Sequence, residues 1–148
     1  MTAKEYLEQA IRIDKRIAAV DNCIKEQVLR KNTLSAIDYS KETIQSSEIS
    51  DVSDLVASID EHIGRLQTEK DRLKFIKNDV ATTINAVKNN VYATLLIRKY
   101  LLDEPWDSVG RAVDVSESTA RKVIHGQALQ EVQRILSVKS ESYQILPP

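Results

Sequence analysis

A group of polar side chains near residue 120 is the part of this sequence best suited to bind a ligand. Their spacing would put them on one face of a helix, and they are Ser116, Glu117, Ser118, Arg121, Lys122 and His125. Arg and Lys contact bases and phosphates, and Ser near a helix N-terminus reaches phosphate oxygens. Glu117 would accept from a cytosine amine or favour the helix dipole. The set predicts a DNA-binding face, with a solvated polar face as the plain alternative.

Three helices must position this face. We expect them at residues 91–102, 106–113 and 116–136. Pro105 ends the first helix and suits the first turn of the second. The only tryptophan, Trp106, begins the second helix and is expected to anchor it against the first.

The residues between the second and third helices follow the packing pattern of a helix-turn-helix. Gly110 is the small residue needed where two helices cross closely. Asp114 is one of the few residue types that tolerate a left-handed turn, and Ser116 is a good N-cap. The small core between the helices is expected to contain Val109, Val113, Val115, Ala120 and Val123.

Two long helices precede this region, at residues 2–31 and 51–88. A Ser- and Thr-rich connector at 32–50 joins them, with a short helix around residues 34–39 as an alternative within it. The apolar residues of the long helices recur in alternating steps of four and three, the rhythm of a helix that buries a narrow stripe. In the second helix Lys70 and Lys77 fall on the stripe. They either extend their amines to solvent or mark where the stripe shifts onto Ile76.

The predicted fold class is all-α, with a long antiparallel coiled-coil-like hairpin followed by a C-terminal helix-turn-helix domain. Residues 1–90 are expected to form the hairpin and to serve as the oligomerisation region. Residues 91–136 are expected to form the DNA-binding domain, and residues 137–148 a flexible tail. Neither long helix can bury its stripe alone, so we expect the helices to pack on each other and on a second copy, as a dimer or higher oligomer. A monomeric hairpin is the alternative.

The composition excludes several function classes. The 148 residues include three Gly, one Cys and two His, which argues against a phosphate-binding loop, a disulfide framework and a metal site. We therefore expect no enzyme activity, no cofactor and no metal. No stretch is long and apolar enough for a membrane span, and the charged N-terminus does not resemble a signal peptide, so a cytoplasmic protein is expected.

The charge is balanced along the whole chain. Residues 1–50 contain eight basic and eight acidic side chains, residues 51–90 six and seven, and residues 91–148 seven and seven. DNA-binding domains are often basic. Contact with double-stranded DNA must therefore depend on where individual cations lie.

The sequence resembles the RinA/ArpU-type phage transcriptional regulators, whose C-terminal part is similar to region 4 of sigma factors. The resemblance rests on the start MTAKEYLEQAIRID, the two long helices and the tract YATLLIRKYLLDEPWDSVGRAVDVSESTARKVIHGQALQEV. The best match is residues 96–132. It implies a phage or prophage protein of a low-GC Gram-positive host, acting in the bacterial cytoplasm. It also implies sequence-specific DNA binding that activates late or packaging genes.

The chain departs from this family pattern at two places. Asp114 stands where glycine is usual. Between Ser116 and the pair Ala128-Leu129 there is one residue more than the usual spacing. His125 lies after this extra residue, so it can fall on either side of the DNA-facing stripe, whereas Arg121 and Lys122 precede the ambiguity.

Two other functions fit the same pattern. A protein-interaction module would use the hairpin and the helix-turn-helix to contact host RNA polymerase or another phage protein, and the low net charge favours it. A small-terminase-like DNA-packaging component also combines a helix-turn-helix with a helical hairpin. It would assemble into rings larger than a dimer.

Overall fold

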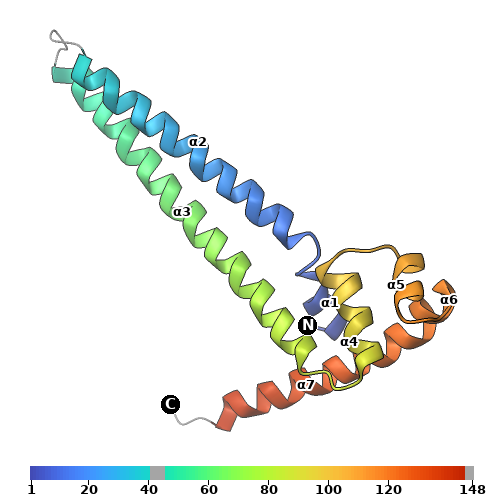
Figure 1. Cartoon of the computed structure of the whole chain (residues 1–148). Helices are drawn as coiled ribbons and strands as arrows, with labels where there is room; N and C mark the ends of the chain where they lie inside the picture. The colour runs from blue at the N-terminus through green and yellow to red at the C-terminus, as the bar shows by residue number, and fades with distance from the viewer. Residues whose placement is uncertain (41–45, 146–148) are drawn as a thin grey trace. The chain divides into compact units, whose positions relative to one another are not determined.

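Every regular element that the structure describes is a helix. The computed structural model describes the backbone of residues 1–40 and 46–145, and the side chains of residues 1–36 and 51–141. Within these ranges there is no strand and no helix long and apolar enough to cross a membrane. The expected all-α class is confirmed. The helices, drawn in Figure 1, are α1 (Ala3–Glu8), α2 (Ile13–Ser40), α3 (Ser46–Asn85), α4 (Asn90–Leu96), α5 (Trp106–Ala112), α6 (Glu117–Thr119) and α7 (His125–Ile145), with π-helical turns η1 (Ile97–Leu101) and η2 (Ala120–Ile124).

The chain divides into two compact units. One unit is Asp14–Lys74, which we call the helical-pair unit. The other combines Met1–Ile13 with Phe75–Pro148, and we call it the terminal unit. The region expected to form the hairpin, residues 1–90, contributes to both units. The terminal unit therefore consists of two segments that are far apart in the sequence.

A turn separates the first two helices, so the single helix expected over residues 2–31 is wrong. Thr2 and Glu5 form the expected capping box at the start of α1. The chain then turns through Gln9–Arg12, where Arg12 has a φ of 58°. This turn lets Ala3, Leu7 and Ala10 all become buried. The four-three spacing did not reveal the break because apolar residues keep the same spacing across it.

In the helical-pair unit, α2 and α3 run side by side in opposite directions (Figure 1). Ion pairs of 2.6 Å join Lys31 to Asp60 and Lys70 to Asp21. Lys70 lies on the inward stripe and has its carboxylate partner there. Ile76, onto which the stripe would shift in the alternative, packs against the core of the terminal unit. The segment expected to be a connector, 32–50, is helical through Ser40 and again from Ser46, and residues 41–45 lie outside the described residues.

The core of the terminal unit is built from both segments of the chain. Leu7 of α1 and Ile84 of α3 are fully buried together with Leu95, Val109 and Val132. The backbone N–H of Ala3 also donates to Gln133 Oε1 at 3.1 Å, across 130 residues of sequence. The N-terminal helix is thus part of this core.

A buried hydroxyl ties three helices of the terminal unit together. Thr83 Oγ1 accepts from Lys139 Nζ at 2.7 Å and lies 2.9 Å from the Tyr6 hydroxyl. Tyr6 in turn donates to Asp79, and burial together with this carboxylate raises the pKa of Tyr6 to about 12. Lys139 belongs to α7, which is helical as far as Ile145. The segment from Ser137, expected to be a loose tail, therefore extends the helix, and residues 146–148 lie outside the described residues.

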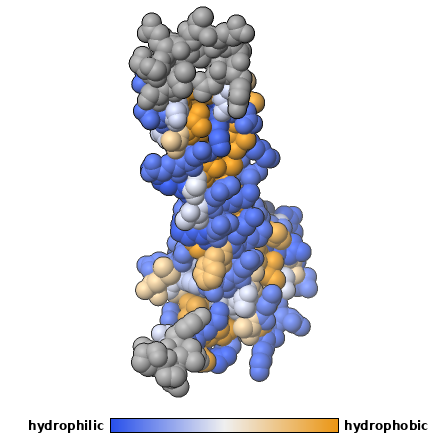
Figure 2. Space-filling view, turned by 90° about the vertical axis from the view of Figure 1, so that its left-hand side faces the viewer, coloured by the Kyte–Doolittle hydropathy of each residue, from blue (hydrophilic) through white to orange (hydrophobic). Residues whose placement is uncertain are grey.

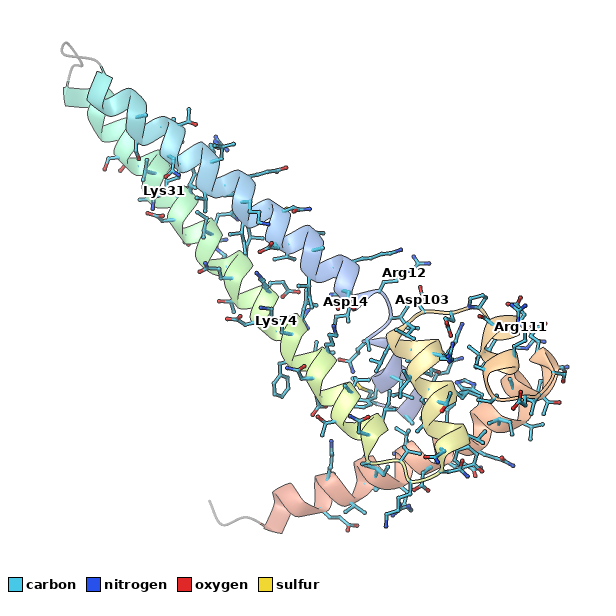
Figure 3. All side chains as sticks on the ribbon, in the orientation of Figure 1. Arg12, Asp14, Lys31, Lys74, Asp103 and Arg111 are labelled. Atoms are coloured by element: carbon cyan, nitrogen blue, oxygen red, sulfur yellow. The ribbon has the colours of Figure 1, made fainter. Side chains whose placement is uncertain are left out.

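An ion pair joins the turn that follows α1 to the turn that follows η1 in the terminal unit. Arg12 and Asp103 both have left-handed backbones, with φ of 58° and 52°. Their side chains point toward one another (Figure 3), and Arg12 Nε lies 3.3 Å from Asp103 Oδ2. The two strained turns are therefore linked by an ion pair.

Candidate nucleic-acid interface

The turn after α5 closes with a complete Schellman motif. The Val115 N–H donates to the Gly110 carbonyl at 3.0 Å, and the Asp114 N–H donates to the Arg111 carbonyl at 3.3 Å. This motif requires a left-handed residue between the two helices. Asp114 fills the position with a φ of 60°, as its residue type predicted.

Gly110 lets the turn approach α5 closely. A Cβ atom at this position would lie 2.9 Å from the Val115 carbonyl oxygen and 3.2 Å from the Glu117 backbone nitrogen. Both neighbours are backbone atoms, which cannot rotate away as a side chain can. The expectation that a small residue is needed at Gly110 is confirmed.

The third helix begins at Ser116, as expected from its N-cap chemistry. The Ser116 hydroxyl accepts from the Thr119 N–H at 3.1 Å and donates to Thr119 Oγ1 at 2.9 Å. The helix then passes through α6 and the π-turn η2 into α7. A π-turn accommodates one extra residue within a helix.

The π-turn changes which residue is buried. Ala120 is fully buried, and the next inward positions are Ile124, Ala128 and Val132, in steps of four. Val123, which we expected in the small core, is instead 48% exposed, so that expectation is wrong. The extra residue in the turn rotates Val123 outward and brings Ile124 into its place.

Five of the six predicted site residues lie together at the exposed start of this helix: Ser116, Glu117, Ser118, Arg121 and Lys122. Arg121 Nη1 lies 3.5 Å from Glu117 Oε1, and both side chains are half exposed. Lys122 has no ion-pair partner within the part of the chain that the structure describes. Sequence reasoning missed Val123, which shares this exposed stretch, and the only signal for it was the extra residue in the spacing.

His125 is partly buried in the terminal unit and does not belong to this exposed group, although it lines a pocket together with Arg121. Its Nε2 lies 2.6 Å from the Tyr100 hydroxyl, and its ring meets the Trp106 ring edge-on, with centroids 4.8 Å apart. Burial, and then the positive charges of Lys4 and Lys99, lower the pKa of His125 to about 4. The imidazole is therefore neutral at pH 7 and packs as an aromatic group.

The charge of the terminal unit is balanced, as it is in the whole chain. Its residues, 1–13 and 75–148, include 11 basic and 10 acidic side chains. Several cations are already paired; Arg111, labelled on α5 in Figure 3, lies 3.5 Å from Asp107. Arg121 and Lys122 therefore stand out by their position beside the helix start.

Among the described residues, no group of three or more His, Cys, Asp or Glu side chains is arranged to hold a metal ion. The arrangement offers hydrogen-bond donors and cations at a helix N-terminus, which suits an anionic partner. Compared with known proteins, the chain matches no family model, no curated protein and no solved structure.

Proposed function

We propose that the protein is a transcriptional regulator that binds a specific sequence of double-stranded DNA through a helix-turn-helix formed by α5 and the helix that starts at Ser116. The main support is that Arg121, Lys122 and Val123 form an exposed group near the start of this helix. The Schellman turn and the close approach at Gly110 hold the helix tightly against α5. The N-terminal part of such a helix normally enters the major groove.

The exposed residues suit different parts of a DNA site. Lys122, which has no competing carboxylate among the described residues, would contact a phosphate. Arg121 would leave Glu117 and bind a phosphate or the O6 and N7 atoms of a guanine. Val123 would contact a thymine methyl group. Together they provide both affinity and sequence preference.

We further propose that α2 and α3 pair with a second copy of the chain. Among the apolar side chains of residues 14–36 and 51–74, only those of Ile59 and Leu73 are buried. Val28, Leu29 and Leu55 are 40%, 68% and 46% exposed. Figure 2 shows hydrophobic patches on the otherwise hydrophilic upper part of the molecule. A dimer would cover such surface and double the phosphate contacts.

The resemblance of residues 96–132 to RinA/ArpU-type regulators supports a more specific proposal. The protein would act in a phage-infected or lysogenic bacterium and switch on late or packaging genes. The π-turn accounts for the extra residue by which the chain departs from that family's spacing.

Selection of bound DNA from a random pool tests the proposed function. We expect one enriched motif, and inverted repeats in it would support two copies. Arg121→Ala with Lys122→Ala should abolish binding to that motif with unchanged helicity. The matched control, Arg134→Ala with Lys88→Ala, removes two cations of the same unit that lie outside the exposed group and should bind normally. A pool without enrichment, or full binding by the Arg121 and Lys122 variant, would overturn the assignment.

A second candidate function has one observation in its favour. The terminal unit has a near-neutral charge balance, which suits a protein partner such as RNA polymerase better than a general affinity for DNA. Early elution from heparin, together with no enriched motif, would support this alternative.

A further inference from the structure

A pocket of about 410 Å³ opens beside the third helix in the terminal unit. Its lining combines aromatic rings with cations. The rings belong to Tyr100, Trp106 and His125, and the cations to Lys4, Lys99 and Arg121. A volume of this size is in the usual range for small-molecule sites.

Both π-turns of the chain's described part supply residues to this pocket. Lys99 and Tyr100 belong to η1, Arg121 belongs to η2, and His125 directly follows η2. A π-turn inserts a residue and redirects the side chains around it, and such turns occur frequently at functional sites. That two π-turns contribute residues to one pocket is a separate observation from its volume and its charge.

The aromatic side of the pocket is fixed in place. Tyr100 is 2% exposed, and its hydroxyl contacts His125 Nε2 at 2.6 Å. The Trp106 ring packs edge-on against His125. Because burial keeps the His125 imidazole neutral, this side offers uncharged rings that can contact a flat apolar group.

The cationic side of the pocket is only partly neutralised. Glu8 is the one carboxylate in the lining and lies 4.0 Å from Lys4, at the limit of an ion pair. Lys99 Nζ lies 4.9 Å from the centroid of the Trp106 ring and has no carboxylate partner among the described residues. Arg121 is paired with Glu117 outside the lining, at 3.5 Å, so Lys99 supplies the positive charge that no described carboxylate offsets beside the rings.

We propose that this pocket binds a small aromatic carboxylate, with its ring against Trp106 and His125, which Tyr100 supports from behind, and its carboxylate beside Lys99 and Arg121. Rings and cations lie within one cavity, so a ligand that carries both groups would use both sides of the lining. A ring without a charge, or a charge without a ring, would use only one of them.

The same residue links this pocket to the proposed DNA interface. Arg121 lines the pocket and also lies on the exposed helix start. A carboxylate that holds Arg121 would withdraw it from DNA, so ligand and DNA would weaken each other's binding by the same factor. This second step rests on the proposed function, whereas binding to the pocket does not.

The only tryptophan, Trp106, lies in the pocket and therefore provides a direct signal. We would follow the single indole N–H resonance in ¹H–¹⁵N spectra of the full chain while adding trans-cinnamate. Cinnamyl alcohol, which lacks the charge, and acetate, which lacks the ring, are the ligand controls. We expect a saturable shift with cinnamate in the millimolar range or tighter. Binding should be at least about tenfold weaker for either control, because cinnamyl alcohol lacks the hydrogen bond between charged groups and acetate lacks the contact with the rings.

Variants separate a specific site from general charge. Lys99→Met should weaken cinnamate binding at least about fivefold, whereas Lys88→Met, which removes an exposed lysine outside the pocket, should not change it. Acetate that shifts the signal as cinnamate does, no saturable shift, or equal binding by Lys99→Met would overturn the proposal. If cinnamate binds but no DNA motif is found, the pocket assignment stands and the proposed function fails.

Discussion

The Tyr100 hydroxyl oxygen lies 2.6 Å from Nε2 of His125. Tyr100 lies within the π-turn η1, and His125 directly follows the other π-turn, η2. The sequence left the orientation of His125 open, and this contact shows which way the side chain turns. The helix face to which it belongs depends on whether the preceding turn contains the extra residue. In the structure His125 is partly buried against Tyr100 and Trp106, so its protonation affects the stability of the fold.

The first prediction concerns acid sensitivity. Burial lowers the pKa of His125 from 6.5 to about 4, so the unfolded chain binds a proton between these values more readily than the folded chain. The contribution of His125 to the free energy of unfolding is fully present above about pH 6.5. It is lost as the pH falls toward 4, and the loss is at most about 3 kcal/mol. Urea unfolding at pH 7 and pH 4.5 measures it.

His125→Gln is the control for this prediction because glutamine does not titrate. Its stability should fall less between the two pH values than that of the original chain, since the carboxylates are common to both. Equal losses in the two proteins would show that His125 is not held neutral.

The second prediction tests the close approach at the turn. Gly110→Ala places a methyl group 2.9 Å from the Val115 carbonyl oxygen, so we expect a loss of about 1–3 kcal/mol in the free energy of unfolding. Gly126→Ala has no atom within 4 Å of its added methyl group and should gain up to about 1 kcal/mol from better helix propensity. Thermal unfolding compares them, and a neutral Gly110→Ala would contradict the packing described.

The third prediction tests the role of the N-terminal helix. Leu7 is fully buried in the terminal unit, so Leu7→Ala should cost about 2–5 kcal/mol. Leu29→Ala, at a position 68% exposed, should cost less than about 1 kcal/mol in dilute protein. Unfolding of the two variants in urea measures the difference. Similar values would argue against α1 as a core element.

The fourth prediction concerns the ion pair at the proposed interface. Glu117→Gln releases Arg121 from its carboxylate, so we expect affinity for the selected DNA motif to rise several-fold at low salt. Glu131→Gln removes the same charge from the Arg134 pair elsewhere on α7 and should have a smaller effect. Titrations at several salt concentrations separate direct contacts from general charge. A larger gain with Glu131→Gln would count against the proposed face.

The turn between α5 and α6 could be predicted because its chemistry is local. A glycine at a close approach, an Asp that accepts a left-handed backbone and a capping Ser each act within a few residues. Gly110, Asp114 and Ser116 therefore appear in the structure as the sequence predicted.

Features that depend on distant partners could not be predicted in this way. The break at Arg12 preserves the apolar spacing on both sides, and contacts with distant residues, such as that between Ala3 and Gln133, show why α1 separates from α2. The π-turn moved Val123 out of the core and Ile124 into it, and no periodicity in this sequence alone distinguishes these two arrangements.

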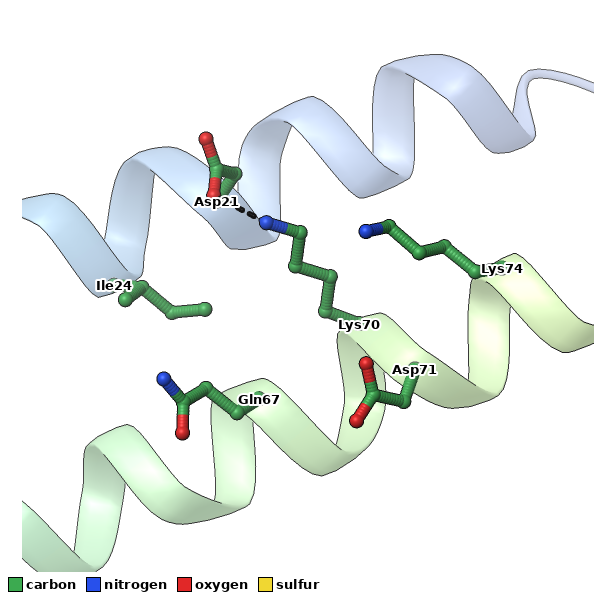
Figure 4. A pocket seen from close by; sticks show the side chains of 6 residues that line it. All are labelled: Asp21, Ile24, Gln67, Lys70, Asp71 and Lys74. Carbon is green, nitrogen blue, oxygen red and sulfur yellow. Dashed lines mark hydrogen bonds and ion pairs between the residues drawn. The ribbon is translucent and has the colours of Figure 1, made fainter.

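The charged seam between α2 and α3 has a consequence for how this pair finds its alignment. Lys70 reaches Asp21 across the seam, beside a pocket lined by Gln67 and Lys74 (Figure 4). A shift of one helix by a turn would separate the two charges and leave Lys70 without this partner, whereas Asp21 would keep Lys25 of its own helix, 3.1 Å away. A single polar pair of this kind fixes the register of paired helices at some cost in stability.

The two-segment construction of the terminal unit sets the order in which the protein can fold as it is synthesised. Residues 14–74 leave the ribosome with both members of their helical pair present, whereas α1 can complete its contacts only after Gln133 has been made. The long chain between Ala3 and Gln133 makes closure of this unit entropically slow. Helix α1 is therefore among the last elements of the terminal unit to complete its packing.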